Sequence, residues 1–156
     1  MYATVALLSP PYASLSYSLP TEFPVEFWKP GLRVAAPLGR GALRAAVLLE
    51  TSAQIDLPPG VVCKDLCWPL EPAPLLAPDL LALAQDLARR QGLTPGSILG
   101  HVLPLGLRKT GVRLHCLHQG RAAVWPLARL RAADQETRAE LAQALLSNAA
   151  RLLPPG

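Results

Sequence analysis

The stretch PLGRGALRAAVLLE, Pro37–Glu50, separates two possible folds for this chain. If Leu32–Pro37 is a strand and Ala42–Glu50 a helix, the glycines between them form a nucleotide-binding turn. If Arg44–Glu50 is instead a second strand, the glycines lie at the tip of a β-hairpin. Local propensity favours the helix, because alanine, leucine and arginine are strong helix formers.

Two observations favour the hairpin. A dinucleotide-binding turn requires the pattern Gly-x-Gly-x-x-Gly, and Arg44 stands where the third glycine belongs. The polar, proline-containing connection Thr51–Gly60 is followed by another β-like run, Val61–Leu70, which suits a curved antiparallel sheet. The sequence therefore predicts strands at 2–8, 15–19, 32–38, 44–50 and 61–70.

After Pro78 the pattern becomes helical. Asp79 is expected to cap a first helix with an apolar stripe of Leu80, Leu83, Leu87 and neighbouring alanines, and Gly92 to end it. A short second helix is expected from Thr94 and Pro95, with Val102 among its buried residues. A β-like piece at 112–117 and a last helix from Asp134 to about Ala149 complete the prediction.

The composition is that of a globular domain. The chain has 156 residues, 51% of them hydrophobic, enough for one ordinary core and a small appendage. Its 17 prolines help to divide the apolar runs into pieces too short to span a bilayer. The first residues lack the pattern of a signal peptide, so we expect a cytoplasmic bacterial protein with reduced thiols.

Positive charge is concentrated in one stretch. No acidic residue occurs between Asp86 and Asp134. This stretch indicates a polyanionic or acidic partner, or alternatively a solvated basic face. Its basic residues are Arg89, Arg90, Arg108, Lys109, Arg113, Arg121, Arg129 and Arg131.

Catalytic and metal-binding motifs are scarce. The sequence contains no Walker loop, no His-Glu-x-x-His and no Gly-x-Ser-x-Gly, so a stand-alone enzyme is not expected and no catalytic residue is assigned. The best candidate metal ligands are Cys63, Cys67, His115, Cys116 and His118. They lack the spacing of a zinc knuckle, so we expect no metal site.

Several segments, taken in order, resemble a known family. They are VALLSPPYASLSYSLP, KPGLRVAAPLGR, the hydrophobic strand after it, a lysine ten residues before PLL, and ILGHVLPLGLR. Over Val5–Arg108 these resemble the N-terminal DNA-binding domain of primosomal protein N′ (PriA), the replication-restart helicase. The resemblance implies an α+β fold: a curved antiparallel β-sheet or partial barrel followed by two helices, with a small C-terminal β/helix appendage.

The resemblance also implies a division of the chain. Residues 1–105 are expected to form the 3′-end DNA-binding domain. Residues 106–156 are expected to form a linker and the incomplete start of a winged-helix-like domain. The chain is thus expected to be an N-terminal helicase fragment.

A pocket for the 3′-terminal nucleotide is a further implication. Its places fall on Leu15, Ser16, Tyr17, Gly39 and Lys64. Gly39 and Lys64 match the family, whereas Leu15 and Ser16 replace an aromatic residue and a carboxylate. A glycine lets nucleic acid approach the backbone closely, and a lysine balances the last phosphate. Further phosphate contacts are expected from Arg40, Arg89, Arg90, Arg108, Lys109 and Arg113.

The implied function is recognition of a DNA end. A closed pocket that satisfies a free hydroxyl rejects a blocked end, so we expect a module for the 3′-terminal nucleotide of the nascent leading strand at stalled forks. The alternatives are a protein interaction module of the restart machinery that has lost end recognition, and general RNA binding by a small β-barrel.

Cofactors and further partners follow from the full-length family. That family is an ATP-dependent 3′→5′ DNA helicase with Mg and Zn, whereas this chain, without the motor, is expected to need no cofactor. Its expected partner is branched or forked DNA with a free 3′ end, not a membrane. Single-stranded-DNA-binding protein and primosome proteins are expected to act through the full-length protein.

Overall fold

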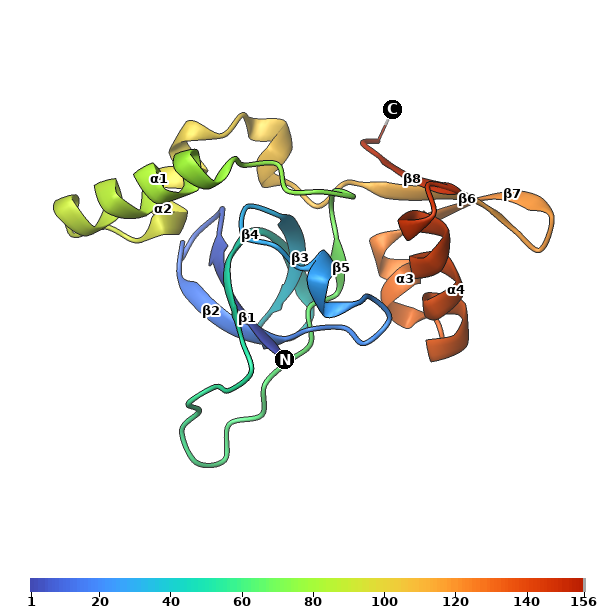
Figure 1. Cartoon of the computed structure of the whole chain (residues 1–156), viewed down its shortest axis with the longest axis horizontal. Coiled ribbons are helices and arrows are strands. Elements are labelled where there is room, and N and C mark those ends of the chain that lie inside the picture. The colour runs from blue at the N-terminus through green and yellow to red at the C-terminus, as the bar shows by residue number, and fades with distance from the viewer. Residues whose placement is uncertain (156) are drawn as a thin grey trace.

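A computed structural model describes residues 1–155 (Figure 1). Its N-terminal part is a five-stranded antiparallel sheet in the order β2-β1-β4-β3-β5. The strands are β1 (Tyr2–Leu7), β2 (Ser14–Ser18), β3 (Arg33–Leu38), β4 (Ala42–Ser52) and β5 (Trp68–Pro69). A short 3-10 turn, η1 (Val25–Phe27), lies between β2 and β3. The predicted α+β class with a curved antiparallel sheet is confirmed.

The hairpin prediction for the glycine stretch is also confirmed. β3 and β4 pair in antiparallel register from Arg33 opposite Val47 to Leu38 opposite Ala42. β4 lies between β1 and β3, and its run Ala45–Leu48 is buried throughout. Tertiary pairing on both sides of this strand outweighs the helical propensity of its alanines and leucines.

The strand predicted over residues 61–70 is largely wrong. Only Trp68 and Pro69 pair with β3, and Asp65 forms a single parallel bridge with Ser18 at the end of β2. This crossing segment, residues 61–70, passes from one edge of the curved sheet to the other, so it pairs only briefly with each. The ring-like shape of a partial barrel results (Figure 1).

Two α-helices follow the sheet, α1 (Pro78–Gln91) and α2 (Pro95–Val102). The predicted cap of α1 is wrong: the helix begins at Pro78, whose fixed φ suits a first helical position, and Asp79 lies in the first turn. The predicted stripe is wrong for Leu80, Leu83 and Leu87, which are exposed, and right for two of its alanines. The buried residues are Leu81, Ala84 and Ala88, and the two small side chains let α1 lie close to its neighbours.

The short helix α2 packs directly on β1. Thr94 caps it as predicted, accepting a hydrogen bond from the Ser97 amide at 3.2 Å. A Cβ at Gly96 would lie 2.3 Å from the carbonyl oxygen of Leu7, so only glycine allows this approach. Val102, which was predicted to be buried, is 67% exposed at the last position of the helix.

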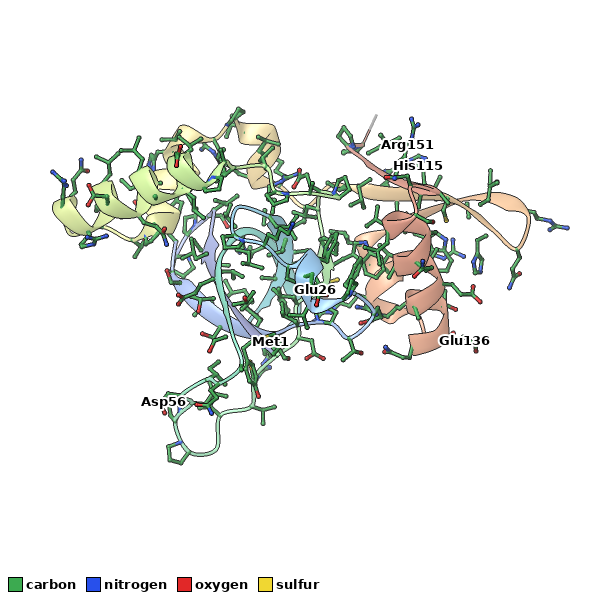
Figure 2. All side chains as sticks on the ribbon, in the orientation of Figure 1. Met1, Glu26, Asp56, His115, Glu136 and Arg151 are labelled. Carbon is green, nitrogen blue, oxygen red and sulfur yellow. The ribbon has the colours of Figure 1, made fainter. Side chains whose placement is uncertain are left out.

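The remaining chain forms a second, three-stranded antiparallel sheet with two helices. The sheet order is β7-β6-β8. After η2 (Leu105–Arg108), the elements are β6 (Arg113–His118), β7 (Arg121–Pro126), α3 (Leu127–Ala132), α4 (Gln135–Leu146) and β8 (Ala150–Leu153). Figure 2 shows His115 and Arg151 near each other on neighbouring strands of this sheet.

The single predicted C-terminal helix is only part of this arrangement. Asp134 does cap α4, accepting a hydrogen bond from the Thr137 amide at 2.8 Å. The helix ends at Leu146, three residues early, because Asn148 turns the backbone into a left-handed conformation (φ 59°) before β8. α3 and β8 were not predicted. Among the helices formed by residues 1–155, none has the length and apolar character needed to cross a membrane.

Candidate functional site

The turn between β3 and β4 meets the crossing segment at Lys64. The Lys64 ammonium donates a hydrogen bond of 2.6 Å to the carbonyl oxygen of Gly39. Gly39 has a left-handed backbone (φ +59°), and a Cβ added there would meet nothing within 4 Å. The turn is therefore open on its outer side and held by a lysine that comes from a distant part of the chain.

A pocket of about 570 Å³ lies beside Lys64. One wall comes from residues 19–22, which follow β2, and another from residues 63–67 of the crossing segment. The third wall is C-terminal: Arg131 in α3, with Gln135 and Arg138 in α4. Gly39 touches this pocket only through Lys64. Residues of the N-terminal part and of the C-terminal helices α3 and α4 thus line one pocket.

The three predicted residues of β2 are divided between the two faces of the strand. Tyr17 is 3% exposed, and its hydroxyl donates a hydrogen bond of 2.9 Å to the carbonyl oxygen of Pro37, which lines the pocket. Leu15 is half-buried on the same face, whereas Ser16 is exposed on the other. Among the described residues that line the pocket, none of these three appears. Tyr17 supports the pocket wall rather than facing its interior.

Asp65 brings a carboxylate to the pocket. It lines the pocket next to Lys64, and its Oδ1 accepts a hydrogen bond from the hydroxyl of Ser18. Asp65 is exposed, and within residues 1–155 it forms no salt bridge. One carboxylate with free acceptor capacity therefore lies close to the lysine.

The other acidic residue in the pocket, Glu22, is occupied by Arg138. The Arg138 Nε donates to the Glu22 carboxylate, and the two side chains are only 13% and 4% exposed. Arg138 also donates hydrogen bonds of 3.0 Å to the carbonyl oxygens of Leu130 and Cys67. This buried network fixes α4 against the crossing segment, and it neutralises the Arg138 charge inside the pocket.

Two cations in the pocket are not neutralised in this way. Arg131 donates a hydrogen bond of 2.7 Å to the carbonyl oxygen of Gly41, as Lys64 does to Gly39. In the part of the chain that the structure describes, neither cation has a carboxylate within salt-bridge distance. The pocket is therefore polar and carries positive charge beside residues 39–41, the glycine turn between β3 and β4. Such a pocket suits an anionic ligand.

The other predicted phosphate contacts are spread over the molecule. Arg40 is exposed in the glycine turn itself. Arg89 and Arg90 lie at the end of α1, within 3.7 and 2.7 Å of Asp86, and α1 extends away from the glycine turn (Figure 1). Arg108 donates to the Leu103 carbonyl oxygen at 2.7 Å and so closes a turn. Lys109 and Arg113 are exposed at the start of the C-terminal part.

The cysteines and histidines considered as metal ligands lie on different elements. Cys63 and Cys67 belong to the crossing segment, and the other three residues belong to β6. In residues 1–155, no group of three or more His, Cys, Asp or Glu is placed to hold a metal ion. Burial raises the pKa of the Cys67 thiol, and burial likewise raises that of Cys116, so both are protonated at neutral pH.

The sequence did not indicate the residues that complete the pocket. Asp65 and Glu22 carry no motif, and Gln135 and Arg138 lie in a helix with an ordinary amphipathic pattern. Arg131 was noted only as one member of a basic stretch. These pocket residues are brought together by the fold, which places the α3–α4 pair against residues 19–22 and 63–67.

The first part of the chain matches a known protein family. A family model described as the PriA 3′ DNA-binding domain (3′BD) matches residues 4–104. No curated protein matches the chain. The matched residues include most of β1, all of β2 to β5, both helices of the first part, and the Gly39 and Lys64 side of the pocket.

Proposed function

The chain belongs to the family of PriA 3′ DNA-binding domains, and from this premise we propose that the pocket beside Lys64 receives the 3′-terminal nucleotide of a DNA strand. The matched domain is a DNA-binding module of replication restart and not a catalytic one. The proposal concerns which part of the DNA it binds, and where.

The contact between Lys64 and Gly39 carries the proposal. A lysine ammonium held 2.6 Å from a turn carbonyl is already oriented, so it loses little rotamer freedom when it meets a phosphate. The neighbouring glycine has no side chain to keep a sugar or base away from the backbone. The adjoining volume of about 570 Å³ is in the range of small-ligand pockets and suits one nucleotide.

Asp65 is the proposed acceptor for the terminal hydroxyl. Residue 16, where the family resemblance places a carboxylate, is a serine whose side chain lies on the exposed face of β2. Asp65 returns a carboxylate to the pocket from the crossing segment, and Ser18 orients it. A free hydroxyl can donate to this carboxylate, whereas a terminal phosphate would place like charges together.

The proposed physiological ligand is the 3′ end of the nascent leading strand at a stalled or branched fork. Arg40, exposed beside Gly39, is positioned to contact phosphates near that end. The forked structure of the DNA and further replication partners are proposed from the family to which the chain belongs. Recognition of an end by backbone, hydroxyl and phosphate contacts is independent of base sequence.

The proposal is tested with the whole chain and two forked DNAs that differ only at the 3′ end of the leading strand. One fork ends in a hydroxyl and the other in a phosphate. We expect binding of the blocked fork to be weaker by about tenfold, the equivalent of one unsatisfied buried group. Fluorescence anisotropy at several salt concentrations separates this effect from general phosphate attraction.

Equal affinity for the two forks at every salt concentration would show that the pocket does not read the end. DNA binding without end recognition would then remain. If neither fork bound at low salt, a protein partner would be the better assignment for this surface.

A further inference from the structure

A second pocket shares Arg131 with the first. It also measures about 570 Å³ and lies between the glycine turn and the C-terminal part. Gly41, Arg113 and Arg131 are among its lining residues, as are apolar side chains such as Val112 and Leu127. Arg131 therefore lines both pockets, together with Lys64 in the first and Arg113 in the second.

One hydrogen bond fixes the Arg131 side chain and leaves most of its donors free for a ligand. One nitrogen, Nη1, donates to the carbonyl oxygen of Gly41 at 2.7 Å. A guanidinium has five N–H donors, so most of them remain free. Arg131 is exposed, and in residues 1–155 it has no carboxylate partner. An oriented, unpaired guanidinium at the rim of a nucleotide-sized pocket has the geometry for a phosphodiester.

We propose that Arg131 binds the sugar–phosphate backbone of the strand whose 3′ end occupies the first pocket, and that this strand continues past Arg131 into the second pocket toward Arg113. The proposal rests on the proposed function for the identity of the first pocket, and it adds the path of the strand. Arg131 lies outside the matched residues 4–104, so α3 supplies a part of the site that the matched domain lacks.

The two pockets explain why the strand takes this direction. A strand that enters the first pocket with its end must leave it on a side where its phosphates meet cations. The wall formed by residues 19–22 carries Glu22, whose charge is already paired with Arg138. The wall at Arg131 leads to a further cation, Arg113, and to apolar carbon surface that can cover sugars and bases.

The test neutralises one phosphate at a time and combines each change with a protein variant. Forked DNAs carry a single uncharged methylphosphonate at the first, second or third linkage from the 3′ end. Each is bound to the wild-type chain and to Arg131→Gln, Arg113→Gln and Arg129→Gln, using anisotropy. Arg129 is the matched control, because it also lies in α3 but packs over the Trp125 ring at 3.9 Å.

We expect the loss of affinity caused by neutralising one of these linkages to depend on Arg131, which is what coupling means here. Neutralising it should weaken wild-type binding by about tenfold but weaken Arg131→Gln binding by less than about twofold. Arg113→Gln should show the same coupling at a linkage farther from the 3′ end. Arg129→Gln should respond as the wild type does at all three positions.

If Arg131→Gln responds to every neutral linkage as the wild type does, the proposal is wrong, even where preference for a 3′ hydroxyl persists. The reverse order of coupling for Arg131 and Arg113 also overturns the proposed path. If coupling persists but hydroxyl preference is absent, the end pocket fails and the Arg131 contact stands. Should Arg131→Gln unfold at assay temperature, Arg131→Lys replaces it, and the charge-retaining variant should keep part of the coupling.

Discussion

Lys64 and Gly39 are 25 residues apart in the chain, yet the lysine ammonium lies 2.6 Å from the glycine carbonyl oxygen. The contact exists because the crossing segment closes the open side of the curved sheet at the end of β2. The Ser18 amide donates to the Lys64 carbonyl oxygen at 2.9 Å, and the Leu66 amide donates to the Ser18 carbonyl oxygen at 3.0 Å. The same backbone bonds that shape the partial barrel therefore position its cation.

Replacing this lysine tests its role directly. Lys64→Met removes the charge and keeps an unbranched side chain, so we expect affinity for a hydroxyl-ended fork to fall by about tenfold. Affinity for the phosphate-ended fork should fall less, because that end is already excluded from the pocket. Competition anisotropy with both forks measures the two losses in one experiment.

Lys29→Met is the matched control, since Lys29 is exposed in the turn before β3. It should change both affinities by less than about twofold. Equal losses for the two forks in Lys64→Met would make Lys64 an ordinary phosphate contact instead.

Local patterns in the sequence were sufficient for strands β1 to β4 and for the caps of α2 and α4. The hairpin at Gly39 follows from a missing third glycine, and the start of α4 follows from Asp134. Both are short-range effects, in which turn chemistry or a side-chain cap decides the backbone.

The sequence was least informative where distant segments meet. The crossing segment has the composition of a strand, but its place between two sheet edges leaves most of it unpaired. The inward face of α1 is made of Leu81, Ala84 and Ala88, while Leu80, Leu83 and Leu87 stay exposed, so most of the large apolar side chains are not the buried ones. Such choices depend on how closely elements pack, and the pocket wall formed by Arg131 depends on them too.

Asp65→Asn tests the proposed acceptor of the terminal hydroxyl. The amide keeps the size of the side chain and an acceptor oxygen, but it removes the negative charge. We expect hydroxyl preference to shrink, because binding of the hydroxyl-ended fork loses a charge-assisted bond while the phosphate-ended fork loses a repulsion. The ratio of the two affinities, measured by anisotropy, should fall by about three- to tenfold.

Asp56→Asn serves as the control for Asp65. Figure 2 shows Asp56 on the loop that follows β4, which projects away from the helices. It should leave the affinity ratio unchanged. A ratio that stays at the wild-type value in Asp65→Asn would assign the hydroxyl to another acceptor.

Tyr17→Phe tests the support under the pocket wall. The phenol hydroxyl donates 2.9 Å to the Pro37 carbonyl oxygen, and its loss leaves that buried oxygen without this donor. We expect the free energy of unfolding, measured in urea, to fall by about 1–2 kcal/mol at neutral pH. Tyr2→Phe, at the start of β1, should cost less than about 0.5 kcal/mol.

The same variant has a pH signature. Desolvation raises the pKa of Tyr17 above its usual value of 10.0, and the nearby Cys63 raises it further. The stability linked to this proton is therefore complete below about pH 10, where even the unfolded tyrosine is protonated. It is lost as the pH rises through the higher pKa of the folded state. Tyr17→Phe should lose less stability than the wild type over this alkaline range, and parallel curves would contradict the assignment.

Arg138 and Glu22 form a buried ion pair between α4 and the segment that follows β2. Arg138→Met leaves a carboxylate that is 4% exposed without its cation, and we expect it to cost about 3–5 kcal/mol in urea unfolding. The control is Arg90→Met, which breaks the surface pair between Arg90 and Asp86. The Arg90 side chain is 75% exposed, so the free energy of unfolding should fall by less than about 1 kcal/mol. Similar costs for the two variants would mean that the buried pair does not hold α4 in place. The double variant Glu22→Leu with Arg138→Met should recover much of the loss, because an apolar pair leaves no buried charge unpaired.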